Sequence, residues 1–106
     1  MDQALSRLGA NVVARAVRVW TGWGIAARPT RDDALVVAEL GEDIALDALP
    51  IVHLCDEVFY ESDAYQRVAD LAEAGRVAAD EFRARFPNLP DSVADDLAWC
   101  YTYDYR

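Results

Sequence analysis

Apolar residues recur every three or four positions over most of the chain, which is the spacing of amphipathic helices. Over residues 3–21 the apolar stripe consists of Leu5, Leu8, Val12, Ala16, Val19 and Trp20. Two further valines widen this stripe, so we expect the helix to be covered on more than one side. The glycines on either side of Trp23 predict the end of the helix and a following loop.

The stretch between Thr30 and Gly41 predicts a short second helix. Thr30 is a suitable N-cap, and Asp32 and Asp33 fall in the first turn, where the helix dipole favours carboxylates. Residues 34–40 form one short apolar run, so a β-strand is the alternative that the sequence leaves open.

Residues 42–60 predict one helix with a break, or two helices joined near Pro50, because a proline inside a helix costs about 3 kcal/mol. After the proline we expect a buried stripe at Ile51, Val52, Leu54, Cys55, Val58 and Phe59. The residues expected to face away from this stripe are His53, Asp56, Glu57 and Tyr60.

The longest predicted helix spans about residues 63–86, after an N-cap at Ser62. Its apolar face consists of Tyr65, Val68, Ala69, Ala72, Ala79, Phe82 and Phe86. Gly75 lies on the same face, which indicates the close approach of a neighbouring helix rather than a break.

Asp91 or Ser92 is expected to be the N-cap of a last helix. Near its end Tyr101, Tyr103 and Tyr105 alternate with polar residues, and this period of two indicates either an extended tail or a frayed helix end. The helical periods and the short connections marked by proline and glycine predict an all-α fold. We expect one domain over residues 1–106, an irregular bundle of four to five helices.

The charge of the chain is strongly uneven. Nineteen acidic residues against ten basic ones give a net charge of −9. Residues 1–31 hold five arginines and one acid, whereas residues 32–106 hold eighteen acids and five arginines. Such an acidic body repels nucleic acid and anionic membranes and favours encounter with a basic partner. The alternative is that the charge only keeps a small protein in solution.

No apolar run approaches the ~20 residues that a membrane-spanning helix needs. The N-terminus has Asp2 where a secretory signal would be positive, and no uninterrupted apolar core follows it. We therefore expect a cytoplasmic protein that does not bind membranes.

Few residues suggest chemistry, and the sequence implies no cofactor. Cys55 and Cys100 lack the spacing of a zinc site, so we interpret them as buried apolar side chains, whether or not they lie close together. His53, Asp56 and Glu57 share a helical face, which suits zinc, manganese or iron. No second predicted helix carries a matching set of metal ligands, so we predict no metal site and favour a solvated polar face. Phosphate-binding loops and nucleophile motifs are absent from the sequence.

Candidate contact residues fall into two groups. An acidic patch with an aromatic anchor consists of Asp56, Glu57, Tyr60, Glu61 and Asp63. Aromatic candidates outside the patch are Trp23 in its glycine-flanked loop and the series Tyr101, Tyr103 and Tyr105. For the tyrosines, packing back onto the domain is the alternative.

These observations predict a small acidic module that binds a basic surface on another protein, for example an inhibitor of the immunity-protein or antitoxin type. One alternative is a helical subunit or homodimer that associates through its wide apolar first helix. Another is a metal-dependent enzyme centred on His53, Asp56 and Glu57, although the sequence favours a role without catalysis.

Overall fold

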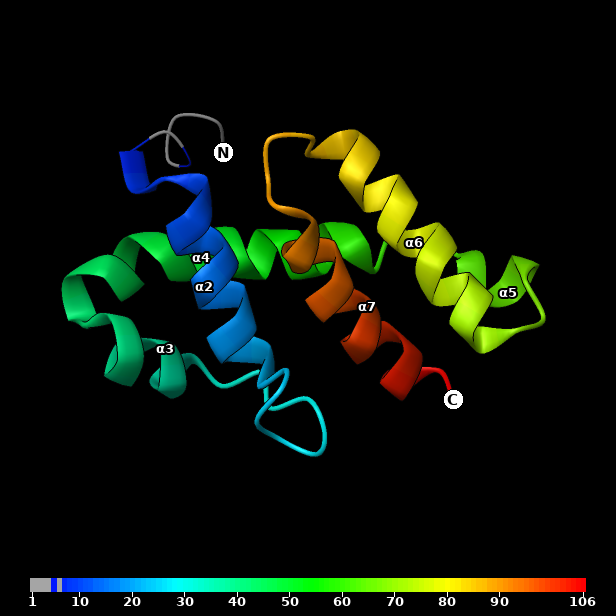
Figure 1. Ribbon diagram of the computed structural model, residues 1–106, viewed down its shortest axis with the longest axis horizontal. Helices are drawn as coiled ribbons and strands as arrows, with labels where there is room; N and C mark the ends of the chain where they lie inside the picture. The colour runs from blue at the N-terminus through cyan, green and yellow to red at the C-terminus, as the bar shows by residue number, and fades with distance from the viewer. Residues whose placement is uncertain (1–4, 6) are drawn as a thin grey trace.

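The computed structural model describes residue 5 and residues 7–106, and within these residues every regular element is a helix (Figure 1). The helices are α2 (Ala10–Thr21), α3 (Asp33–Leu40), α4 (Glu42–Phe59), α5 (Ala64–Arg67), α6 (Leu71–Arg85) and α7 (Asp91–Asp104). Five of these helices span eight residues or more, and α5 is a single turn. The all-α prediction is confirmed, whereas the strand alternative for residues 34–40 is wrong because α3 covers them.

The longest helix, α4, forms one layer of the molecule by itself. It has eighteen residues, which at 1.5 Å per residue makes it about 27 Å long. Helices α2 and α7 cross α4 on the same side and pack against each other, while α3 packs beside α4 and α6 packs against α7 (Figure 1). The result is a slab with principal extents of 42 × 29 × 17 Å.

The core lies where α2 and α7 cross α4. Its largest fully buried side chains include Val13, Val17, Val52, Phe59, Leu97 and Tyr101. The ring of Phe59 also packs against Phe82 of α6, with ring centroids 5.7 Å apart. Burying a side chain of this size stabilises a fold by about 1.5–3 kcal/mol, so these contacts determine how the helices are arranged.

The first predicted helix is interrupted at Gly9. Leu5, Arg7 and Leu8 are helical, but Gly9 has φ of 91°, in the region that favours glycine, and α2 begins after it. Residues 3, 4 and 6 of the predicted helix lie outside the described residues. The C-terminal end agrees with the prediction, because Gly22 has φ of 80° and donates its N–H to the Arg18 carbonyl at 3.0 Å.

The loop over residues 22–29 is closed at its base by Thr30. The backbone N–H of Thr30 donates to the carbonyl of Thr21 at 3.0 Å, and its hydroxyl donates to the carbonyl of Trp20 at 2.7 Å. The predicted N-cap is therefore displaced, and Asp32 caps α3 by accepting from the N–H of Ala34 at 2.9 Å.

Helix α4 runs through Pro50 without ending, so neither the predicted break nor the alternative of two helices is correct. Proline has no N–H, and in a helix this leaves the carbonyl four residues earlier without its usual donor. That carbonyl belongs to Leu46, which is exposed, as Pro50 is. Water can solvate it there, which explains why the proline is tolerated.

The predicted helix over residues 63–86 is wrong as one element. Val68 is extended, with φ of −120° and ψ of 126°, and it separates α5 from α6. Asp70 starts the second piece by accepting from the N–H of Ala72 at 3.2 Å. Asp70 and Glu73 have the spacing of a capping box, so the sequence did carry a signal for this start.

Gly75 brings α6 close to α7, as its position on the apolar face predicted. A Cβ atom at this position would lie 2.6 Å from Cγ2 of Thr102. Helix α7 includes Tyr101 and Tyr103 and ends at Asp104, and the N–H of Tyr105 donates to the carbonyl of Tyr101 at 3.1 Å, so an extended tail is not formed there. Within the described chain, no helix has the length and apolar character needed to cross a bilayer.

Candidate functional site

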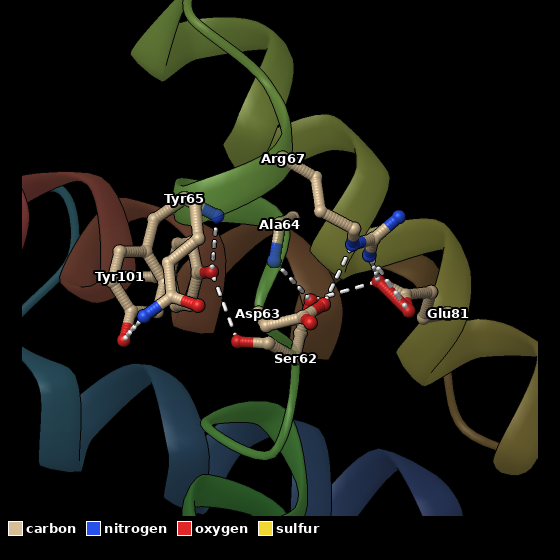
Figure 2. Close-up of polar contacts among 8 residues, drawn as sticks. Ser62, Asp63, Ala64, Tyr65, Arg67, Glu81 and Tyr101 are labelled. Atoms are coloured by element: carbon tan, nitrogen blue, oxygen red, sulfur yellow. Dashed lines mark hydrogen bonds and ion pairs between the residues drawn. The ribbon is translucent and has the colours of Figure 1, made fainter.

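The predicted acidic patch is partly neutralised within the chain. Glu61 accepts a hydrogen bond from Nη1 of Arg85 at 2.7 Å. Oδ1 of Asp63 accepts from Nε of Arg67 at 2.6 Å, and Figure 2 shows Arg67 reaching from Asp63 to Glu81, 3.2 Å away. These exposed pairs contribute little to stability, but they reduce the charge that Glu61 and Asp63 offer to a partner.

Asp56 was predicted to face away from the buried stripe of α4, but the structure places it partly inside the molecule. Its side chain is half-buried, and its Oδ1 atom is buried without a hydrogen-bond partner among the described residues. Burial raises the pKa of this carboxyl, and the positive charge of Arg31 opposes that rise. The buried stripe of α4 runs through Val52, Cys55 and Phe59, and Asp56 lies at the edge of this stripe.

Tyr60, the predicted aromatic anchor of the patch, is held by two charged side chains. Its hydroxyl donates to Asp104 at 2.5 Å and accepts from Nη2 of Arg31 at 2.7 Å. Arg31 and Asp104 also form an ion pair with each other. Arg31 has φ of 48°, which is uncommon for a residue other than glycine. The three side chains join the segment before α3 to the ends of α4 and α7.

The three C-terminal tyrosines do not form one contact surface. Tyr101 is fully buried. Its hydroxyl accepts from the N–H of Tyr65 at 3.0 Å and donates to the carbonyl of Ser62 at 3.1 Å (Figure 2). The ring of Tyr105 stacks on Tyr65 with centroids 3.9 Å apart, while Tyr103 lines a groove between α6 and α7. The fold covers the side chain of Tyr101, which is the packing alternative that the sequence left open, so Tyr101 offers no exposed surface to a partner.

Trp23 is exposed, as its loop position predicted. The guanidinium carbon of Arg18 lies 4.3 Å from the centre of its ring. Arg18 also donates two hydrogen bonds to Asp96, at 3.0 and 3.2 Å, and the side chain of Asp96 is fully buried. Burial raises the pKa of Asp96, and the hydrogen bond from Arg18 opposes the rise.

A groove of about 730 Å³ lies between α2, α3 and the loop over residues 22–29. Its apolar lining includes Ala14, Val19, Ile25, Ala26, Leu35 and Ala38. The ion pair between Arg15 and Glu39, 3.2 Å apart, also belongs to its wall.

His53 faces Asp33 of α3 instead of forming a site with Asp56 and Glu57. Its Nε2 atom and the indole N–H of Trp20 both lie 2.8 Å from Oδ1 of Asp33. The hydrogen bond from His53 lowers the pKa of Asp33. Across the residues that the structure describes, no group of three or more His, Cys, Asp and Glu side chains is placed to hold a metal ion.

Both cysteines are buried and unbridged. Burial raises the pKa of each thiol to about 12. Each therefore stays protonated near neutral pH, and a thiol in that state is a poor nucleophile. The interpretation of Cys55 and Cys100 as buried small side chains agrees with this environment.

One face of α4 combines exposed apolar and acidic side chains, and we call it the outer face of α4. It consists of Asp43, Leu46, Pro50, Leu54 and Glu57, which follow one another at steps of three or four residues. Leu46 is 76% exposed and Leu54 38% exposed. The prediction that Leu54 is buried is wrong, because α2 and α7 cover the opposite side of the helix.

Sequence reasoning overlooked three members of this face: Asp43, Leu46 and Pro50. Their helical spacing to Leu54 and Glu57 was visible in the sequence. This spacing was not recognised because a break was expected at Pro50, and the residues before and after the proline were therefore assigned to separate helical segments.

Most charged side chains elsewhere are paired. Eight of the ten arginines form ion pairs with carboxylates of the described chain. Asp32 and Asp70 cap helices. Among the described residues, the exposed carboxylates that neither pair nor cap are Glu42, Asp43 and Glu57, all three on α4.

Comparisons with known proteins give no relative: no family model, curated protein or solved structure matches this chain. Its function is therefore inferred from its own residues.

Proposed function

We propose that the protein is an acidic binding module that attaches to a basic surface of another protein through α4. The observation that supports this is the location of the free negative charge. Glu42, Asp43 and Glu57 are exposed, have no internal ion pair among the described residues, and lie on one helix. Such charges act over a Debye length of about 8 Å at physiological salt, and they speed encounter with a basic surface.

An inhibitor that covers the basic surface of its target, as immunity proteins and antitoxins do, is the most concrete form of this function. The net charge of −9 supports a protein partner of opposite sign. It disfavours nucleic acid and anionic membranes, whose charge has the same sign.

The two alternative functions gain less support from the residues that suggested them. A homodimer through the first helix needs its wide apolar face, but Val13, Ala16 and Val17 are fully buried within the chain. A metal-dependent enzyme needs His53 among carboxylate ligands, but the imidazole is held by Asp33.

The proposal is tested with a partner captured from extracts of the source cells, identified by mass spectrometry and then purified. Its association rate is measured by stopped-flow fluorescence at low and high salt. The variant Glu42→Gln/Asp43→Asn/Glu57→Gln is expected to slow association on the order of tenfold at low salt, and much less at high salt.

A matched control variant removes three carboxylates that already have internal partners. Glu39→Gln/Glu61→Gln/Asp63→Asn changes the net charge by the same amount, but it removes residues paired with arginines. We expect this control to associate within about twofold of the wild-type rate. The proposal is wrong if the α4 variant associates like the wild type at every salt concentration, or if the control slows association equally.

A further inference from the structure

The outer face of α4 has the spacing of a helix-packing surface. Leu46, Pro50 and Leu54 are four residues apart, so they form one apolar row along the helix. Asp43 and Glu57 continue the row at its two ends. At 1.5 Å per residue the apolar part is about 12 Å long, the span of two turns on a partner helix.

This face is open in the described structure. The side chains on the opposite side of α4, Ala48, Val52, Cys55 and Phe59, are buried against the other helices. Figure 1 shows α2 and α7 crossing α4 on one side, in front of it. The exposure of Leu46 and Leu54 confirms that no described element covers the other side.

The charges around the apolar row determine what kind of partner fits it. Asp43 and Glu57 lie at its ends, and Asp47 lies beside it, 3.6 Å from Arg7. The imidazole of His53 stands on the other side and is held by Asp33. A second copy of this chain would bring the same carboxylates against each other, and like charges across an interface are repulsive. The complementary partner is therefore basic at both ends of its apolar part.

We infer that the outer face of α4 binds an amphipathic helix of the partner, with apolar side chains four residues apart and a lysine or arginine at each end. This inference rests on the proposed function and specifies the partner's shape. Helices that place an apolar stripe against an apolar surface are a common mode of peptide recognition. Contact along one helix buries less than the roughly 1,200 Å² of a standard interface, so micromolar affinity is expected.

The test uses two synthetic peptides of about 20 residues with identical composition and positive charge. In the patterned peptide, leucines recur every four residues between lysines, and in the scrambled peptide the same residues are shuffled. Binding of each to the full chain is measured by fluorescence anisotropy at about 20 and about 300 mM salt. We expect the patterned peptide to bind about tenfold more tightly than the scrambled one, a difference of about 1.4 kcal/mol.

Two variants locate the binding. Leu46→Ser/Leu54→Ser removes the apolar row and is expected to abolish the preference for the patterned peptide. Ile25→Ser is the matched control, because Ile25 is 94% exposed but lies in the loop after α2. It should retain the preference. Circular dichroism of each variant checks that the helices are intact, as expected for substitutions at exposed positions.

The possible failures are distinguishable. If both peptides bind equally and the double variant changes nothing, the helix-docking inference is wrong while charge-driven binding stands. If neither peptide binds even at low salt, the inference is wrong and the proposed function loses its electrostatic basis. If Ile25→Ser abolishes the preference, the docking surface lies at the loop and the assignment to α4 is wrong.

Discussion

Arg18 and Asp96 lie 78 positions apart in the chain and join α2 to α7 through two hydrogen bonds. Among the ion pairs of the described residues, theirs is the one in which the carboxylate is completely buried, while the guanidinium is 44% exposed. Removing one partner of a buried pair costs more than the pair contributes, because the remaining charge is left uncompensated. The two residues are therefore not equivalent: the arginine can return to water, whereas the aspartate cannot.

Arg18→Met is expected to destabilise the fold by about 3 kcal/mol at pH 7, because it leaves Asp96 buried without a counter-charge. Burial already raises the pKa of Asp96, and losing Arg18 raises it further. A carboxyl with a raised pKa stabilises the fold below its unfolded pKa of about 3.9 and loses this contribution as pH rises. The loss in Arg18→Met should thus be smaller near pH 4, measured by urea unfolding. Arg15→Met, in an exposed pair, should cost less than about 1 kcal/mol.

Asp56→Asn is expected to raise stability at neutral pH by roughly 1 kcal/mol, because it removes a half-buried charge whose Oδ1 has no partner. Burial raises the pKa of Asp56, so the wild-type protein loses stability as pH rises through that pKa. The variant lacks this loss, and the two melting temperatures should converge at about pH 3. Glu57→Gln on the exposed face is the control and should follow the wild type. A constant difference between Asp56→Asn and wild type at all pH values would contradict the assignment.

Gly75→Ala is expected to destabilise the protein although alanine favours helices by about 1 kcal/mol over glycine. The new methyl group would lie 2.6 Å from Cγ2 of Thr102, and such overpacking costs about 1–3 kcal/mol. Thr102→Ser removes the obstructing methyl group, so the double variant should recover most of the loss. Thermal unfolding of both single variants and the double variant measures this coupling. Additive effects would show that α6 and α7 do not meet at this point.

The two thiols are expected to react slowly with Ellman's reagent in the native protein at pH 8. Their pKa of about 12 keeps nearly all of each thiol protonated, and both are buried. In denaturant both should react within the mixing time of a manual assay. Cys55→Ala and Cys100→Ala assign the two reactions. Fast reaction of either thiol without denaturant would indicate local opening at that helix.

The helices themselves were predictable because their signals are local. Three- and four-residue periods predicted helices in the regions of α2, α4, α6 and α7, and Gly22 predicted the end of α2. The interruption at Val68 was missed, although Asp70 carries a cap signal, because the apolar period continues across it. Local patterns show where a helix can continue, but packing against neighbouring helices decides where it turns.

The contact surface was harder to predict because burial and pairing depend on residues far away in the sequence. Glu61 is 24 positions from Arg85, and Arg31 is 73 positions from Asp104. Nothing local to either acid indicates these pairs. For the same reason Leu54 was placed inside: only the positions of α2 and α7 determine which side of α4 is covered.

The closed base of the loop after α2 makes its tip suitable for carrying foreign sequence. Thr30 ties the two ends of the loop together through Trp20 and Thr21, while a Cβ at Gly24 would meet no atom within 4 Å. Compact surface loops whose ends are held together tolerate insertion at the tip. A short epitope or fluorophore-binding tag between Gly24 and Ile25 would thus report on the protein from a position outside the outer face of α4.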